Sequence, residues 1–303
     1  MQQYSSFSQR AIELASCNLH AWVNPQNGMN VERIVYKGVD VIFCDLQRRE
    51  KGATYAVPIL FPTPNRVENN QFTFNGKTYY AKMHGIAHFS TFRILQNIQT
   101  SQEHLLSGVL NVDVNSLAYK WYAFQCQIFI RIRVLLNKII WEYTVKNTGS
   151  SPCPYSFGLH PFFKKYKGVT YQVFAKNMME NTTEKIPTGK LLQLNTQFDV
   201  RLPTNPDDNA FDNVFCVQNN PMARFYYPSE KISVTIRASK QFKRCVVYTP
   251  SHAEFFCIEP QTSSINCHNL HNDGYVTEAN LQIVPAHCSQ SGWISFDFSD
   301  DNA

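Results

Sequence analysis

The sequence predicts an all-β fold, a single large antiparallel β-sandwich that forms one domain over residues 1–303. Three observations favour this fold class. Hydrophobic and polar residues alternate with a period of two in several stretches, as they do in half-buried strands. An Asn-Gly pair separates two short stretches of this kind, and helical patterns are few. Sheets built from such strands bury their apolar faces by packing on one another.

Two neighbouring stretches in the middle of the chain have the clearest strand pattern. Residues 128–136 (IFIRIRVLL) place aliphatic side chains on one face, and residues 139–147 (IIWEYTVKN) alternate in the same way. Asn137 and Lys138 lie between them, where a tight hairpin turn belongs. A second hairpin is expected over residues 72–80, because its central Asn-Gly pair suits the positive φ angles of a type I′ turn.

Further strands are expected over residues 231–238, 245–249 and 293–298. Only residues 8–16 and 207–214 favour helix, and each would form one short turn. Clusters of proline and asparagine interrupt the chain often, but none is long enough to be an interdomain linker. No repeat of fixed period stands out, so a propeller or a solenoid is not expected.

The charge balance argues against a nucleic-acid partner. The chain carries 28 basic and 23 acidic residues, a net charge of +5, and it is 44% hydrophobic. Basic residues cluster only at residues 47–51 and 242–244, and we interpret both short clusters as solvated loops. A protein that binds nucleic acid concentrates more positive charge on one face.

The cysteines and the lack of long apolar stretches favour a cytoplasmic protein. Nine cysteines form no CxxC pair, and their odd number does not favour a disulfide framework. No window of about 18 uninterrupted apolar residues is present, and the N-terminus lacks the pattern of a signal peptide. The sequence therefore predicts a cytoplasmic location and no membrane partner.

Two ionisable residues lie in apolar surroundings. His160 is the one imidazole in residues 155–163 (YSFGLHPFF), where it lies either at the bottom of a cleft or in the core with a backbone partner. Glu259 follows the apolar run 255–258, at the expected end of a buried strand. A carboxylate there is costly unless it is partnered or functional, and burial makes it a better base near neutral pH. The alternative is a glutamate that faces water.

Two further stretches carry polar candidates. Three prolines stiffen residues 56–67 (AVPILFPTPNRV), which deliver Asn65 and Arg66 side by side as donors for substrate hydroxyls. The alternative is a surface turn with a solvated arginine. Asp212, in the stretch DNAFDNVF, either accepts hydrogen bonds from sugar hydroxyls or caps a local turn.

The spacing of histidines and cysteines does not predict a metal site. His84 and His88 are four residues apart in MHGIAHFSTF, but their surroundings resemble strand and loop, and no carboxylate follows in a ligand pattern. Cys267, His268 and His271 form a compact cluster that lacks a matching second half. We therefore expect no metal at either place.

In combination, these stretches resemble one protein family. The segments PILFPTPNRV, NGKTYY, MHG, GLHPFF, DNVF and EPQT occur in the order found in the aldose 1-epimerases, the galactose mutarotase family. The resemblance runs from about Ile34 to Trp293, most of the chain. It implies a galactose mutarotase-like β-sandwich with a sugar bound in a cleft on one sheet, and it implies no cofactor.

The resemblance also implies a role for each polar candidate. The family's catalytic base falls on Glu259, its general acid on His160 and its supporting histidine on His84. Sugar binding falls on Arg66, Asp212 and, beside the arginine, Asn65. The implied reaction interconverts the α and β anomers of an aldohexose, because the base takes the anomeric proton while the acid protonates the ring oxygen. The expected partner is a small sugar, and the expected assembly is a monomer or a homodimer.

One segment points to a different substrate. HGIAHFSTF is more similar to the hexose-6-phosphate 1-epimerase branch, although that branch carries a phosphate-binding arginine where this chain has His88. PILFPTPNR instead resembles the branch that acts on unphosphorylated sugars. A free aldohexose is therefore the first hypothesis, and a hexose 6-phosphate is the alternative. A non-catalytic carbohydrate-binding sandwich is a third reading, but sugar binding alone does not need the acid–base pair that this chain retains.

Overall fold

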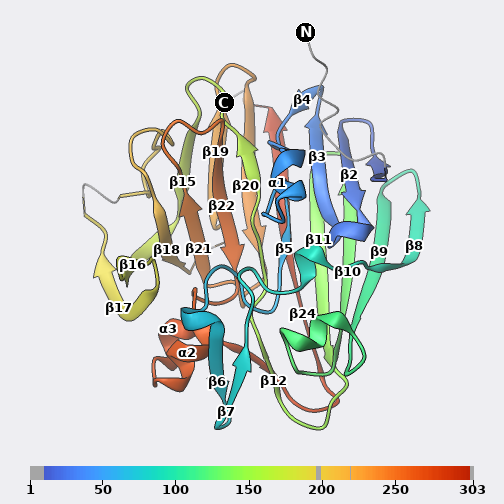
Figure 1. The fold of residues 1–303 in the computed structure, drawn as a ribbon. Helices are drawn as coiled ribbons and strands as arrows, with labels where there is room; N and C mark the ends of the chain where they lie inside the picture. Colours follow the sequence, from blue (N-terminus) through green and yellow to red (C-terminus); the bar gives the residue numbers. More distant parts are fainter. Residues whose placement is uncertain (1–9, 196–198, 219, 301–303) are drawn as a thin grey trace.

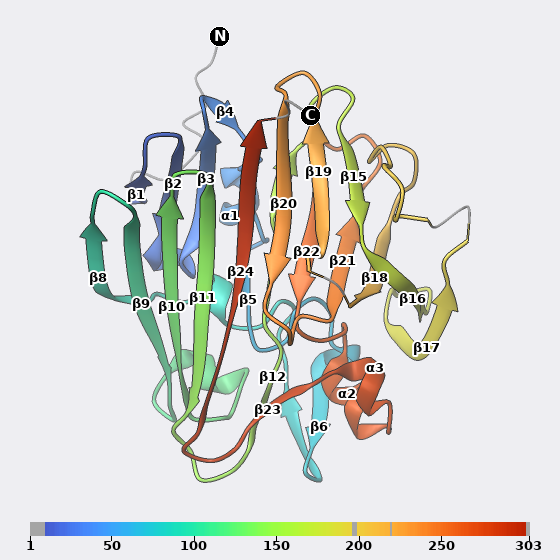
Figure 2. The ribbon, with the colours of Figure 1, turned by 180° about the vertical axis from the view of Figure 1, so that it is seen from behind.

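Two antiparallel sheets of eight strands each lie face to face in the computed structural model, which describes residues 10–195, 199–218 and 220–300 (Figure 1). Figure 2 shows the outer face of the sheet with the longer strands, here called the long sheet. Its strand order is β15 (Thr170–Val173), β19 (Ala223–Tyr227), β20 (Ile232–Ala238), β24 (Ser289–Asp300), β11 (Lys138–Asn147), β10 (Cys126–Leu135), β9 (His104–Val112) and β8 (Arg93–Gln99). The predicted all-β sandwich is confirmed.

The opposite sheet, here called the short sheet, carries the residues of interest for function. Its strand order is β17 (Pro187–Gln193), β16 (Ala175–Asn181), β18 (Asp212–Val217), β21 (Arg244–Tyr248), β22 (Phe255–Gln261), β13 (Gly158–Leu159) and β5 (Ile59–Leu60), with β14 (Phe162–Lys164) also paired to β22.

Smaller elements surround the two sheets (Figures 1 and 2). A four-stranded sheet contains β1 (Ile12–Ala15), β2 (Leu19–Asn24), β3 (Asn30–Tyr36) and β4 (Val39–Asp40), and two strand pairs are β6 (Gln71–Phe74) with β7 (Lys77–Tyr80) and β12 (Cys153–Tyr155) with β23 (Gln282–Val284). The helices are α1 (Leu46–Glu50), α2 (Cys267–Asn272) and α3 (Val276–Ala279). Within the described ranges, no helix has the length and apolar character needed to cross a membrane.

Aromatic rings fill much of the core between the two sheets. Phe163 of β14 and Phe256 of β22 belong to this core, as does Phe296 of β24 on the long sheet. The Phe163 ring centroid lies 5.4 Å from that of Phe296 and 5.6 Å from that of Phe256. Successive side chains of a strand point to opposite faces, so Phe162 and Cys257 lie on the other face of the short sheet. That outer face holds the site described below.

The strands expected from period-two patterns are present. Residues 128–136 and 139–147 correspond to the hairpin β10–β11, and residues 72–80 to the hairpin β6–β7. The turn of the first hairpin is Leu136 and Asn137 rather than the expected Asn137 and Lys138, because Lys138 already pairs with Leu135. In the second hairpin, Asn75 and Gly76 have φ angles of 49° and 73°, as a type I′ turn requires. The three remaining predicted strands correspond to β20, β21 and β24.

Both helical predictions are wrong. Residues 12–15 form the strand β1, which pairs with β2, while residues 8 and 9 of this predicted turn lie outside the described residues. Residues 212–217 form the strand β18, which lies between β16 and β21. Short segments have weak helical preference, and pairing with distant strands overrides it.

Three further expectations need correction. In the second basic cluster, expected to be a solvated loop, Arg244 begins β21, is only 6% exposed and donates from its Nε to Ser264 Oγ. Residues 46–50, which include most of the predicted basic loop, form α1, and the Asp45 side chain caps this helix by accepting the N–H of Gln47. Glu259 lies inside β22 rather than at its end, since the strand continues to Gln261. A buried carboxylate in the middle of a sheet needs partners, and these are described next.

Candidate active site

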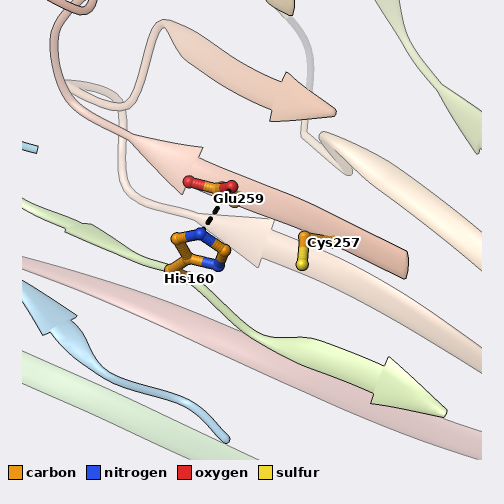
Figure 3. A group of neighbouring side chains, drawn as sticks. All are labelled: His160, Cys257 and Glu259. Atoms are coloured by element: carbon orange, nitrogen blue, oxygen red, sulfur yellow. Dashed lines mark ion pairs between the residues drawn. The ribbon is translucent and has the colours of Figure 1, made fainter. Parts of the chain in front are cut away.

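A single antiparallel register places His160 opposite Glu259. The strands β13 and β14 both pair with β22, and their paired residues flank these two positions (Gly158 with Gln261, and Phe162 with Cys257). The two side chains approach each other across the strands, with His160 Nε2 3.4 Å from Glu259 Oε1 (Figure 3). Their residues are only 6% and 1% exposed, so the contact lies in a region of low dielectric constant.

Neighbouring groups hold this pair in position. The His160 ring stacks on Phe162, with ring centroids 4.5 Å apart and an angle of 5° between the planes. The Gln261 Nε2 donates a hydrogen bond of 3.0 Å to Glu259 Oε2. Gly158 makes room for this glutamine, because a Cβ at position 158 would lie 2.8 Å from Gln261 Cγ.

Burial shifts the pKa of both groups toward their uncharged forms. It raises the pKa of Glu259 well above its usual value, and it lowers the pKa of His160 to about 3. The resting pair therefore favours one proton on the carboxyl group beside a neutral imidazole. Transfer of this proton to His160 Nε2 creates a carboxylate and an imidazolium without changing the total charge of the pair.

Arg66 and Asp212 come together from distant segments. Asp212 is the first residue of β18, and Arg66 lies in the proline-rich segment after β5. The Arg66 Nη2 donates to Asp212 Oδ2 at 3.1 Å, and its Nη1 donates to Asn65 Oδ1 at 3.1 Å. About 35% of the Arg66 side chain remains exposed, so the guanidinium can also reach a ligand.

His84 lies beside the pair of His160 and Glu259, with its ring centroid 5.4 Å from that of His160. The Asn65 backbone N–H donates to His84 Nδ1 at 3.3 Å, so the proton of the neutral ring is on Nε2. Burial lowers the pKa of His84 well below its usual value, which keeps the ring neutral. The following Gly85 is required by close packing, because a Cβ there would lie 2.0 Å from the Phe61 carbonyl oxygen.

The six residues predicted for the site line one cavity of about 340 Å³. Its lining residues are Arg48, Gly52, Ala53, Thr54, Asn65, Arg66, Lys82, Met83, His84, His88, His160, Phe162, Asp212, Tyr248 and Glu259. Two other cavities are larger, at about 730 and 880 Å³, but they contain none of the six. We take the smaller cavity as the candidate active site because it combines the buried ionisable pair of His160 and Glu259 with hydrogen-bonding groups.

Sequence reasoning missed Arg48 and Tyr248. The Arg48 guanidinium lies over Phe162, with its Cζ 5.2 Å from the ring centroid, and its Nε donates to the Thr54 carbonyl at 2.9 Å. Tyr248 ends β21, where it pairs with Asp212. No local signal marked either residue, because a short basic cluster and a strand-end tyrosine are usual surface features.

Cys267 and His268, which the sequence places in one short cluster on α2, have a packing role. Cys267 and His268 are buried, and Cys267 Sγ lies 3.5 Å from His268 Nδ1. The His268 ring centroid lies 4.3 Å from that of Phe72 on β6. These contacts fasten α2 to the hairpin β6–β7.

Comparisons with known proteins agree with this architecture. A galactose mutarotase-like protein from Clostridium acetobutylicum matches with a TM-score of 0.87 at 20% identity, covering 96% of this chain and 95% of the other. Galactose 1-epimerase from Lactobacillus acidophilus NCFM matches with a TM-score of 0.80 at 12% identity, covering 99% and 97%. The GalM/aldose epimerase homologue from C. elegans matches with a TM-score of 0.77 at 16% identity, covering 96% and 99%.

These structural matches show a common fold. The sequence itself matches the family model described as aldose 1-epimerase over residues 18–283, which is most of the chain. The chain therefore belongs to the aldose 1-epimerase family.

Proposed function

We propose that this protein is an isomerase that interconverts the α and β anomers of an aldohexose. The observation that carries the proposal is the contact of 3.4 Å between His160 Nε2 and Glu259 Oε1, in a cavity lined by hydrogen-bonding groups. Membership of the aldose 1-epimerase family supports a carbohydrate epimerase role. A cytoplasmic location and a monomeric or homodimeric state remain predictions.

The proposed reaction uses one base and one acid. With the proton on His160 and Glu259 ionised, the Glu259 carboxylate takes the proton of the anomeric hydroxyl, and a carbonyl forms at C1. The bond between C1 and the ring oxygen breaks, and the ring oxygen receives the proton from His160 Nε2. Rotation about C1–C2 and reversal of both transfers then give the other anomer. Each proton-transfer group typically contributes about 10²–10⁴-fold in rate.

The remaining groups would orient the sugar. The Arg66 guanidinium and the Nε2–H of His84 donate to sugar hydroxyls, and the Asp212 carboxylate accepts from them. Asn65 holds both donors through its own hydrogen bonds to Arg66 and His84. Fixed donors and acceptors of this kind lower the entropic cost of reaching the reactive geometry.

A second candidate substrate is a hexose 6-phosphate, and two cations favour it. Arg48 and Lys82 line the cavity, and within the described residues no ion pair joins either of them to a carboxylate. The Lys82 Nζ instead lies 3.9 Å from the ring centroid of Phe89. Two such cations suit an anionic group on the substrate.

Polarimetry tests the proposal. Freshly dissolved α-glucose and α-galactose should mutarotate faster with the protein than spontaneously. Glu259→Gln removes the base with little change in volume, so it should lower turnover about 10²–10⁴-fold while circular dichroism stays unchanged. Equal turnover by Glu259→Gln and the wild-type protein would refute the role of Glu259.

The same assay separates the alternatives. Acceleration only of glucose 6-phosphate and galactose 6-phosphate would identify the second candidate. Sugar binding without acceleration of any of the four compounds would leave the carbohydrate-binding sandwich as the function.

A further inference from the structure

Cys257 lies next to the acid–base pair, and the proposed reaction gives it no task. It is two residues before Glu259 on β22, so both side chains point to the same face of the sheet. A ring nitrogen of His160, the Cys257 Sγ and a carboxylate oxygen of Glu259 all lie within 4.8 Å of one another (Figure 3). The three residues are buried, and the Cys257 thiol is free.

Two atoms of this group lack a hydrogen-bond partner among the described residues. They are His160 Nδ1 and Glu259 Oε1, and both are buried. The Glu259 Oε1 faces His160 Nε2 at 3.4 Å, but this contact lacks the geometry of a hydrogen bond. A buried polar atom without a hydrogen-bond partner destabilises the folded protein. A ligand that binds to such an atom would therefore lower the free energy of this group.

We propose that His160, Cys257 and Glu259 form an inhibitory site for a zinc-type divalent cation. Imidazole, thiolate and carboxylate together suit Zn²⁺ or Cd²⁺, whereas magnesium and calcium prefer oxygen ligands alone. Metal–ligand bonds of about 2.0–2.3 Å bring tetrahedral ligand atoms to roughly 3.5 Å from one another. The present separations need to close by about 1 Å, which small side-chain rotations provide.

Charge and access also fit a divalent cation. On binding, the ion would displace the protons of the Cys257 thiol and the Glu259 carboxyl group, and the resulting thiolate and carboxylate would neutralise its two positive charges. Gln261 already donates to the other oxygen of Glu259, as an outer partner of a metal ligand does. His160 and Glu259 line the cavity of about 340 Å³, which provides an entry path and room for a water as fourth ligand.

Metal binding would block the proposed reaction, and this consequence rests on the function proposed above. The bound ion would occupy the carboxylate lone pair that takes the anomeric proton, so Glu259 could no longer act as the base. Binding itself does not depend on that function, so it is measured separately.

Direct titration with Cd²⁺ and Zn²⁺ tests the site. The starting protein carries Cys17→Ser and Cys288→Ser, because these exposed thiols would bind metal on their own. We expect one equivalent of Cd²⁺ to produce the ultraviolet thiolate-to-cadmium charge-transfer band, and calorimetry to find one equivalent of Zn²⁺. Cys257→Ala should abolish the band, and Glu259→Gln should weaken Zn²⁺ binding on the order of 100-fold.

Cys267→Ala is the matched control, since it also removes a buried thiol that lies beside a histidine. Cys267→Ala should bind one equivalent of Cd²⁺ and of Zn²⁺, as the starting protein does. Cys257→Ser replaces the alanine variant if the alanine variant does not fold. An unchanged band in the Cys257 variant, or no bound equivalent in the starting protein, would overturn the proposal.

Inhibition is the second readout. Zn²⁺ should slow mutarotation by the starting protein, a chelator should restore it, and Cys257→Ala should keep its turnover in the presence of Zn²⁺. Inhibition of both proteins alike would also overturn the proposal. Failure of the polarimetric assay itself would count against the proposed reaction, while the Cd²⁺ band would still decide the metal site.

Discussion

At the scale of single residues, Arg66 depends on a partner 146 positions away in the chain. Its Nη2 donates to Asp212 Oδ2, and its Nη1 donates to Asn65 Oδ1. These bonds fix the plane of the guanidinium, so the remaining donors point in a defined direction. Because the side chain is partly exposed, the ion pair with Asp212 contributes little to stability, and its main effect is orientation.

We predict that Arg66→Ala weakens sugar binding. A hydrogen bond to a charged group is worth about 1.5–3 kcal/mol, which corresponds to roughly a 10- to 100-fold increase in KM. The measurement is KM and kcat from polarimetry. Asp212→Ala should raise KM as well, and the double variant should show less than the sum of both effects, since the residues act as a unit. An unchanged KM in Arg66→Ala would contradict this role.

A second prediction concerns His268 and the dependence of the free energy of unfolding on pH. Burial lowers the pKa of His268 to about 4, whereas a histidine in an unfolded chain titrates near 6.5. Below pH 6.5 the unfolded state binds a proton that the folded state resists until about pH 4. Stability is therefore fully present above pH 6.5 and is lost as the pH falls toward 4, by an amount on the order of 3 kcal/mol.

Urea unfolding at pH 7.5 and pH 4.5 measures this loss. His268→Gln should lose less stability than the wild-type protein over this interval, because glutamine does not titrate. The buried His84, His88 and His160 also have lowered pKa values, but they contribute equally to both proteins. An equal loss of unfolding free energy in the wild-type protein and in His268→Gln would show that His268 is not the titrating group.

At the scale of elements, β22 organises the site. It pairs with β21 on one side and with β13 and β14 on the other, and it supplies Glu259 and its hydrogen-bond donor Gln261. This register requires a residue without a side chain at Gly158. A Cβ there would lie 2.8 Å from Gln261 Cγ and 3.0 Å from the Pro260 carbonyl oxygen.

We predict that Gly158→Ala lowers turnover. The added methyl group must displace Gln261, which would release Glu259 from its position. Small displacements of a catalytic group cost on the order of 10²-fold in rate, so we expect a fall in kcat approaching that size. Gly149→Ala is the control, because the atom nearest to a Cβ there is 3.5 Å away, at ordinary contact distance. Equal kcat values for the two variants would show that the site tolerates the shift.

Element boundaries illustrate where sequence reasoning succeeds. The hairpins β6–β7 and β10–β11 were predictable, because turn chemistry and period-two alternation are properties of adjacent residues. The strand β1 and the helix α1 were not, because each depends on contacts outside its own segment. The pairing of β1 with β2 and the hydrogen bond from Arg48 to Thr54 stabilise conformations that the local residues only weakly favour.

At the scale of the whole molecule, the two sheets depend on a common aromatic core. Phe296 of the long sheet contacts Trp141 of the same sheet and Phe163 of the short sheet, with ring centroids 4.8 and 5.4 Å apart. The backbone that carries Phe163 also carries Phe162, on which the His160 ring stacks. The core thus supports the site from behind without contributing an atom to it.

We predict that Phe296→Ala lowers the free energy of unfolding by about 3–5 kcal/mol, because it leaves a cavity between the sheets. Urea unfolding measures this loss, and Phe296→Leu should lose considerably less. The folded fraction of Phe296→Ala should keep its kcat, since Phe296 packs between the two sheets and the cavity lies on the outer face of the short sheet. A large loss of kcat in fully folded protein would show that core packing also sets the geometry of the pair.

The sequence by itself determined the fold class, two hairpins and several further strands, and six of the polar residues that line the cavity, but not Arg48 or Tyr248. Alternation with a period of two assigns a side chain to a face of its strand, and motif residues such as those around His160 and Glu259 mark the chemistry. Both kinds of information are local in the chain.

Only the tertiary structure decided which of these residues meet. The opposition of His160 and Glu259 follows from the register of β22 with β13 and β14, and the closeness of Cys257 follows from the same register. The position of Arg48 over Phe162 likewise joins segments that are far apart in sequence. Periodicity identifies the face of a strand but not its neighbour, because the partner and the register are chosen by packing energies summed over the whole sandwich.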